Sequence, residues 1–400
     1  MTTQQVRQRP SLDVVHSTHA TLSGLLTAGL LDRYARLLGA YREAFEVRVF
    51  SWDSDDYSER LGVTHVPFMA RVGHSVIERG AYYLWVAMRA PTMRGVVKAY
   101  GSSIPTLPLV RLLSGRPLLV TFQWDYASQT RANEAPGLKN CVAPLVERLS
   151  LMPADAVLVT TEWLEDVVRQ RYDKPTVLVP NFVDAPALPG GRAGEGRQAG
   201  SVLFAGRLHH SKGLEPLIRA FQVVKQLHSR ATLTICGSGE DGARLKALVA
   251  SLDVRDVRFL GTLPNAEVLT LMARSQVLVL PTVTMEGHPK ALIEGMACGA
   301  TCVVTDVPGN REIITSGQTG LVVRPDDVDS LAEAIGRALS DEELRLTLAR
   351  NAIAAAKAYS FERTVGTEIQ ALLALGAGQS WHGRFAPHRA QSHGRGHHAE

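Results

Sequence analysis

The 400-residue sequence has few cysteines, no long apolar run and no dense run of basic residues. Its four cysteines form no C-x-x-C pair, so buried, reduced thiols are favoured over a disulfide framework or a metal site. No stretch reaches the roughly 18 apolar residues of a membrane span, and the polar residues 1–10 have no signal-peptide core. The formal net charge of +4 is small for this length, which makes nucleic acid a poor candidate partner. A cytoplasmic protein is therefore the expectation.

Short apolar runs rich in β-branched residues alternate with amphipathic stretches, which predicts parallel, doubly wound sheets. A chain of 400 residues with 45% hydrophobic content has enough material for two cores. The strands expected in the first half are residues 13–16, 47–51, 64–68, 118–122, 156–160 and 176–179. Helical patterns lie between them, for example over residues 22–38 and 138–149.

A fresh strand–helix series begins after residues 186–200, a stretch with little that could pack and therefore a predicted linker. Its expected strands are residues 202–205, 232–236, 257–260, 277–280, 301–305 and 320–323, with helices that begin near 213, 242, 265, 289 and 328. We therefore expect an α/β protein with two Rossmann-like domains, residues 1–185 and 201–358, facing each other across a cleft. A last helix is expected near 361–375, and residues 376–400, rich in His and Gly, are expected to be a disordered tail rather than a metal site.

Two glycine-containing loops of the second series are candidate anion sites. The strand at 202–205 continues into Gly206-Arg207-L-H-H-S-Lys212-G, where Gly206 allows a close turn and the two cations can converge on an anion. Basic residues in such loops are also often only solvated. The loop from Gly237 to Gly242 fits G-x-G-x-x-G, which raises a dinucleotide alternative. It follows the second strand of its domain, and the next strand ends without an acid, so a turn near a nucleotide base or sugar is favoured.

The segment 281–299 is the most informative. A loop containing Glu286 leads to Pro289, which suits the first turn of a helix, and Gly299 is a natural helix end. The N–H groups of Lys290, Ala291 and Leu292 would point out of the helix start and, with the helix dipole, form a pocket for a diphosphate. Glu286 and Glu294 flank this pocket and suit recognition of sugar or ribose hydroxyls; a helix cap and an exposed side chain are the alternatives.

Glu286-x7-Glu294 resembles the E-x7-E signature of retaining GT-B glycosyltransferases, in particular glycosyltransferase family 4. The context E-G-H-P-K-A-L-I-E-G-M-A-C-G, the segment T-D-V-P-G-N-R-E-I-I with Glu312, and G-R-L-H-H-S-K-G upstream are similar to that family too. The stretch V-L-V-P-N-F-V-D resembles the end of its N-terminal domain, and A-Y-S-F-E-R the turn before a helix, here 359–375, that crosses back to that domain. The resemblance is dense from about 176 to 375 and thin before that.

The resemblance implies a role for each matching residue. Arg207 and Lys212 would bind the donor diphosphate and stabilise the leaving nucleotide, and Glu286 would contact the transferred sugar. Glu294 would hold the ribose hydroxyls. The main chain from His288 to Leu292 would cradle phosphate and sugar, with the Gly206 and Gly237 turns beside the donor. No metal or other cofactor is implied, because fixed cations and helix ends replace it.

The chain departs from the family pattern mainly on the acceptor side. His288 stands where an aromatic residue is common, which leaves the donor sugar open. The first β–α loop lacks the paired glycines, and Asp125 lies near where the family commonly has a His. Asp125 is a candidate for orienting an acceptor hydroxyl, and His16 or His19 is another.

The expected activity is transfer of a hexose from a UDP- or GDP-sugar to a hydroxyl of a glycan, a lipid-linked glycan or a small molecule. Seventeen of the 24 aromatic residues precede residue 185, so an N-terminal acceptor domain and peripheral contact with a membrane are also expected. The alternatives are a sugar-nucleotide epimerase or hydrolase, a non-catalytic nucleotide-sugar binding protein and, least favoured, an NAD oxidoreductase.

Overall fold

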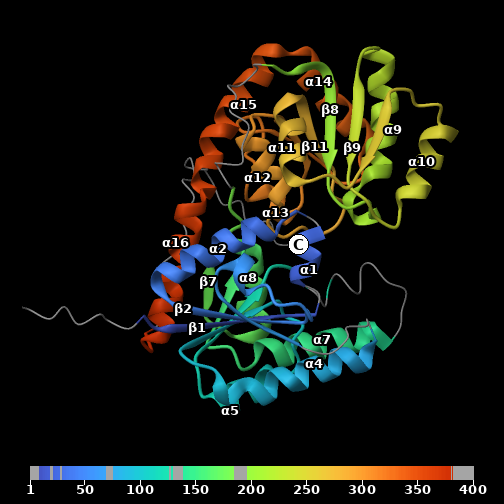
Figure 1. The fold of residues 1–400 in the computed structure, drawn as a ribbon. Coiled ribbons are helices and arrows are strands. Elements are labelled where there is room, and N and C mark those ends of the chain that lie inside the picture. Colours follow the sequence, from blue (N-terminus) through green and yellow to red (C-terminus); the bar gives the residue numbers. More distant parts are fainter. Residues whose placement is uncertain are drawn as a thin grey trace, which may run out of the picture.

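The protein consists of two α/β domains, shown in a computed structural model (Figure 1). The structure describes residues 9–18, 21–27, 29–68, 75–125, 128, 138–183, 196–379 and 381. Within these residues no helix combines the length and apolarity needed to cross a bilayer. The two halves of the chain form one sheet each, and helices cover both faces of each sheet.

The first sheet has seven parallel strands in the order β3-β2-β1-β4-β5-β6-β7. Its strands are β1 (Ser11–His16), β2 (Glu46–Ser51), β3 (Thr64–Pro67), β4 (Val96–Tyr100), β5 (Leu118–Phe122), β6 (Ala156–Val159) and β7 (Thr176–Leu178). The helices between them are α1 (Leu22–Thr27), α2 (Leu31–Ala44), α3 (Ser58–Leu61), α4 (Val76–Arg89), α5 (Leu107–Ser114), α7 (Leu138–Leu151) and α8 (Glu162–Tyr172). β1 lies between β2 and β4, so the direction of winding reverses there.

Two features of this half differ from the prediction. The single helix expected over 22–38 is two helices, α1 and α2, and Gly29 between them has a φ of 66°, which a continuous helix does not permit. β4 was missed, because Lys98 at its centre interrupts the apolar run; its ammonium group is nevertheless buried.

The second sheet has six parallel strands in the order β10-β9-β8-β11-β12-β13. They are β8 (Gln198–Ala205), β9 (Thr232–Cys236), β10 (Val257–Gly261), β11 (Ser275–Leu280), β12 (Thr301–Thr305) and β13 (Leu321–Val323). The accompanying helices are α9 (Leu214–Leu227), α10 (Gly242–Ser251), α11 (Asn265–Arg274), α12 (Lys290–Ala297), α13 (Pro308–Arg311), α14 (Val328–Ser340) and α15 (Glu342–Ala356). β8 begins three residues inside the predicted linker 186–200, whose C-terminal boundary is thereby corrected; residues 184–195 lie outside the described part.

The last helix, α16 (Phe361–Gly376), packs on the first domain although it follows the second. Phe361, Val365 and Leu372 belong to the apolar core beneath β1 and α2. Lys98 of β4 donates hydrogen bonds to the hydroxyls of Tyr41 (2.7 Å) and Tyr100 (3.0 Å) and forms an ion pair with Glu368 of α16. A buried ionic contact therefore holds the C-terminal helix on the N-terminal domain. Residues 382–400, the predicted tail, lie outside the described part.

Candidate donor site

The candidate site lies where the second sheet changes its direction of winding. β8 has β9 on one side and β11 on the other, and ligands of doubly wound domains bind beyond the carboxyl ends of the strands at such a point. The loop after β8 carries Gly206, Arg207 and Lys212, and the loop after β11 carries Glu286. The two strands next to the switch point thus supply the residues that the sequence singled out.

Lys212 and Glu286 meet across this point in an ion pair between Nζ and Oε2. Thr282 also donates a hydrogen bond to Glu286 Oε2 (3.2 Å). Both side chains are half-buried, so solvent still reaches the pair from the cleft. The sequence predicted a role for each of these two residues but not their contact. The ammonium group of Lys212 orients the Glu286 carboxylate.

A cavity of about 370 Å³ lies at the end of β8 and is lined by both domains. Its wall includes the turns at Gly206 and Gly237, the start of α12 at Lys290 and Ala291, and Glu294. Three cationic side chains and one carboxylate face it together with an apolar part: Arg33, Arg207, Lys290, Glu294, Leu263, Val268 and Met272. Such a combination suits a ligand with an anionic part, hydroxyl groups and a flat or apolar part.

Arg33 is a charged residue of this cavity that the sequence did not indicate. It comes from α2 of the first domain, and its Nη1 lies 2.9 Å from Glu294 Oε1. The guanidinium also stacks on the ring of Phe182, 4.5 Å from the centroid, and donates to the Phe182 carbonyl. Both charged side chains are almost fully buried. The carboxylate predicted to hold a ribose therefore bridges the two domains in this structure.

One prediction about the start of α12 is wrong. Leu292 N–H donates to the Pro289 carbonyl (3.1 Å), so it does not point out of the helix start as predicted. The amides of Lys290 and Ala291 precede any residue that could offer an intrahelical acceptor. The anion pocket at this helix therefore rests on two N–H groups rather than three.

His288 is buried and is not among the residues that line the cavity. Its carbonyl accepts a hydrogen bond from Asn181 Nδ2 (2.5 Å), and its ring packs edge-on against Tyr359 at 5.0 Å. Burial lowers the pKa of His288 to about 3, so the ring is neutral at ordinary pH. This position therefore contributes its main chain to the junction between the domains.

A glycine is required at position 237, where the loops that follow β8 and β9 touch. Its φ is 131°, and a Cβ built there would lie 1.9 Å from the carbonyl oxygen of Gly206. Any side chain would separate the two turns and widen the cavity. The G-x-G-x-x-G match thus reflects close backbone packing between β8 and β9.

On the opposite side of the cleft, the proposed acceptor residues are already engaged. Asp125 is buried, forms an ion pair with Arg171 (2.6 Å) and accepts from the Ser128 amide. Burial alone would raise the pKa of Asp125, but hydrogen bonds from Arg171 and Ser128 outweigh it and lower the pKa. His16 is buried, with Nε2 2.6 Å from the Tyr34 hydroxyl, and His19 lies outside the described residues. An acceptor-orienting role stays a prediction for all three.

Aromatic residues of the first domain mostly pack in its core. Trp52 and Tyr82 are buried against each other and Phe68, as their ordinary role predicts. Trp124 is 50% exposed and follows Gln123, whose carbonyl oxygen would lie 2.5 Å from a Cβ added at Gly287. Of these rings, that of Trp124 is exposed, and the residue before it packs against the loop that carries Glu286.

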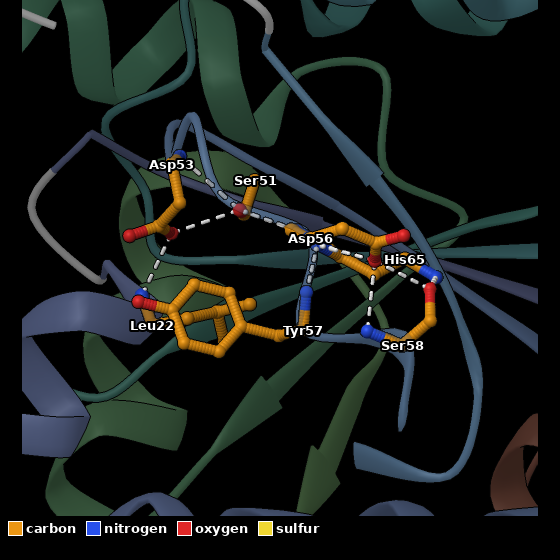
Figure 2. Close-up of polar contacts among 7 residues, drawn as sticks. All are labelled: Leu22, Ser51, Asp53, Asp56, Tyr57, Ser58 and His65. Atoms are coloured by element: carbon orange, nitrogen blue, oxygen red, sulfur yellow. Dashed lines mark hydrogen bonds and ion pairs between the residues drawn. The ribbon is translucent and has the colours of Figure 1, made fainter. Parts of the chain in front are cut away.

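A polar network holds the start of α1, the element that leads to Arg33 (Figure 2). Asp53 accepts hydrogen bonds from the amides of Leu22 (2.8 Å) and Ser23 (2.9 Å) and from the Ser51 hydroxyl (2.8 Å). His65 Nδ1 accepts from the Tyr57 amide, so the proton of the neutral ring lies on Nε2, 2.8 Å from Ser51 Oγ. Burial lowers the pKa of His65 despite the nearby Asp53 and Asp56. The network fixes the helix start without a charged histidine.

Among the described residues one group has metal-ligating side chains close together, namely His209, His210 and Glu240. His209 Nε2 lies 2.9 Å from Glu240 Oε1, and its Nδ1 lies 2.7 Å from Ser211 Oγ. Both ring nitrogens thus have protein partners, and both histidines line a separate hollow of about 410 Å³. We interpret these contacts as structural, because they hold the conformation of the loop 206–213.

Comparison with known proteins gives the class of the chain. The solved structure of HepE from Anabaena, in complex with UDP and glucose, superimposes with a TM-score of 0.72 at 18% identity, over 92% of this chain and all of HepE. The fold is therefore GT-B, the two-domain architecture of many glycosyltransferases, and the predicted fold class is confirmed.

The family follows from the second domain. Residues 195–355 match the family described as glycosyl transferases group 1, so the second domain is similar to that family. A glycogen synthase of Mycobacterium tuberculosis is 25% identical over 74% of this chain and 72% of its own length. An exopolysaccharide phosphotransferase of Streptomyces coelicolor is 34% identical over 50% of this chain but only 21% of its own length. The matched family segment contains the whole second sheet and both loops of the candidate site.

Proposed function

We propose that this chain transfers a hexose from a UDP- or GDP-sugar to a hydroxyl group of a glycan, a lipid-linked glycan or a small molecule, with retention at the anomeric carbon. The observation that carries the proposal is the ion pair of Lys212 and Glu286 at the switch point, in the two loops whose other residues line a cavity with three cations, Glu294 and apolar side chains. The cavity suits a nucleotide. Lys212 follows the cavity-lining turn at Gly206 and Arg207, and Glu286 precedes the cavity-lining start of α12, so the transferred sugar would lie beside this pair.

Each group then has a chemical task. Arg207, Lys212 and the amides at the start of α12 would neutralise the diphosphate as the nucleotide leaves, without a metal ion. Glu294 forms an ion pair with Arg33 in this structure. When a nucleotide binds, Glu294 would release Arg33 and accept hydrogen bonds from the ribose hydroxyls instead. Glu286 would accept from hydroxyls of the sugar. HepE was solved with UDP and glucose, which supports a uridine nucleotide as the first donor to test.

The transfer step needs no separate protein base. The acceptor oxygen forms a bond to the anomeric carbon on the face from which the phosphate oxygen departs. The acceptor proton passes to that phosphate oxygen, whose bond to the carbon breaks. The engagement of Asp125 by Arg171 and Ser128 is consistent with this scheme, because no acceptor-side carboxylate has to be unpaired.

A donor screen tests the proposal. We expect nucleotide release from one of a set of UDP-, GDP- and ADP-sugars, and release that depends on an added acceptor. Donor consumption without an acceptor would favour an epimerase or a hydrolase instead. Thermal shifts with UDP or GDP but no turnover in a broad acceptor screen would favour a binding protein, and NADH binding would favour an oxidoreductase.

Replacing Glu294 by Ala should weaken UDP or GDP binding. Loss of hydrogen bonds between a charged carboxylate and the ribose hydroxyls is expected to lower the affinity roughly 10- to 100-fold. Calorimetric titration of the variant measures it. Glu333→Ala, an exposed carboxylate on α14 of the same domain, is the control and should bind like wild type. Equal affinity for all three proteins would remove Glu294 from the site.

Nucleotide affinity should also fall as the pH rises through about 8. Desolvation by the protein around the start of α12, and then the charge of Arg33, lower the pKa of Lys290 to about 8, whereas Glu294 raises it; the side chain itself is exposed to solvent. The ammonium group that attracts a diphosphate is thus present below pH 8 and lost above it. Between pH 7 and pH 9.5 we expect UDP affinity to fall roughly fivefold, a modest value because solvent screens the charge. Lys290→Met should bind with the same affinity at both pH values.

A further inference from the structure

Three helices of the first domain carry an unusual number of exposed apolar side chains. Of the fifteen large apolar residues exposed among the described ones, nine lie on α4, α5 and α7 or directly after α7. These helices cover the face of the first sheet that is turned away from the second domain (Figure 1). We call this surface the apolar face.

Helix α4 is apolar on two opposite sides. Tyr82, Tyr83 and Val86 point into the core, whereas Ile77 and Leu84 are 84% and 55% exposed. Ile77, Leu84 and Met88 are seven and four residues apart, the spacing that places side chains on one helical face. A helix that is apolar all round belongs to a buried or membrane environment, so its outer side requires a partner.

The neighbouring helices continue the same surface. α5 packs against α4 and α7, so their outer sides adjoin. Leu112, the most exposed on α5 at 76%, is flanked by Leu109 and Leu113, and α7 exposes Leu145. These side chains are aliphatic, whereas protein interfaces are enriched in Tyr, Trp and Arg at their centres.

The charges in the stretch that carries α4 and α5 are mostly positive. From Arg79 to Trp124 the chain has no Asp or Glu but five arginines. The acids near this stretch are engaged: Glu78 caps the start of α4, and Asp155 pairs with Arg111. Arg89 and Arg116 are exposed, and the stretch 79–124 that contains them has no acidic residue.

We propose that the apolar face binds the surface of an anionic lipid bilayer. Aliphatic side chains would enter the boundary between headgroups and acyl chains, while arginines contact the anionic headgroups. The helices that bind would lie parallel to the surface, since none spans it. α4 and α5 each follow a strand whose carboxyl end faces the cleft, so their first turns, including Ile77, lie on the cleft side. A hydroxyl carried by a lipid could thus reach the cleft from the membrane beside it.

Flotation with vesicles tests the proposal without any donor or acceptor, so its result does not depend on the transfer activity. We expect the full-length protein to float with vesicles of phosphatidylcholine containing phosphatidylglycerol at low salt, and not with phosphatidylcholine alone. The double variant Leu84→Glu/Leu112→Glu should lose about tenfold or more of this partitioning, because two charges replace apolar contacts. Leu227→Glu, at an 80% exposed leucine of α9 in the other domain, should float like wild type.

A second variant separates the two contributions. Arg89→Glu/Arg116→Glu should lose binding to the anionic vesicles while leaving the aliphatic side chains in place, and high salt should weaken the wild type in the same direction. No flotation of wild type with anionic vesicles at low salt would overturn the proposal. So would binding that survives Leu84→Glu/Leu112→Glu, or a dimer of this chain that the same double variant dissociates while vesicles stay unbound.

Discussion

Glu286→Gln is expected to lower kcat for sugar transfer roughly 10²–10³-fold while the protein remains folded. The substitution keeps the shape of the side chain but removes its charge, and with it the ion pair to Lys212. Because both groups are half-buried in a cleft, folding depends little on the pair, whereas a sugar hydroxyl would lose a charged acceptor. Initial rates with the donor identified by the screen, with circular dichroism in parallel, measure both properties.

Lys212→Ala should give a loss of similar size, because it removes the partner of Glu286 and a cation from the path of the leaving diphosphate. Glu215→Gln is a matched control: this carboxylate also forms ion pairs, with Arg219 and Arg244, in the same domain but outside the candidate site. It should retain wild-type rates. Undiminished turnover in both Glu286→Gln and Lys212→Ala would contradict the proposal that this site catalyses sugar transfer.

Glu368→Ala is expected to lower the free energy of unfolding by about 3–5 kcal/mol, the cost of leaving a buried charge without its partner. Glu368 of α16 forms an ion pair with Lys98, whose side chain is 1% exposed at the centre of the first sheet. Burial alone would lower the pKa of Lys98, but Glu368 and Tyr100 raise it, so the lysine is charged in the folded protein. Without Glu368, only the two tyrosine hydroxyls remain for that charge. Urea unfolding measured by fluorescence gives the difference.

Two variants show whether the burial of the charge is responsible. Glu362→Ala removes an exposed carboxylate of the same helix, 3.4 Å from Arg36, and should change the unfolding free energy by about 0.5 kcal/mol or less. Lys98→Met combined with Glu368→Leu should recover much of the loss, because an apolar pair of similar volume needs no desolvation of charge. A Glu368→Ala protein as stable as Glu362→Ala would contradict the anchoring of α16 by this contact.

The fold was predictable where local composition and burial agree. Strands such as Thr232–Cys236 and Thr301–Thr305 are β-branched runs buried in a parallel sheet, and their predicted bounds match the structure. Val96–Tyr100 was missed because a lysine usually marks solvent, and only Glu368, far along the chain, explains its burial. The break between α1 and α2 was missed because the apolar periodicity continues through it.

The candidate site shows the same division. The loops with Arg207, Lys212 and Glu286 could be expected at one edge, because they follow strands of one predicted parallel sheet. That β8 and β11 are neighbours is known only from the structure. Arg33 could not be anticipated, because its contact with Glu294 depends on how two domains dock. The bond from Leu292 N–H to Pro289 depends on the detailed geometry of the first helical turn, which residue types do not determine.

Glu312 of the second domain caps the start of a helix in the first domain. This carboxylate, at the end of α13 in the second domain, accepts the amides of Glu162 (2.7 Å) and Trp163 (2.9 Å) at the start of α8 in the first. Thr161 accepts the Leu164 amide by itself, so α8 is completed partly from its own chain segment and partly from across the cleft. Separation of the domains must exchange two charge-assisted hydrogen bonds for water. A form with separated domains would therefore have a less stable start of α8, and backbone amide exchange at residues 162 and 163 would report such a separation.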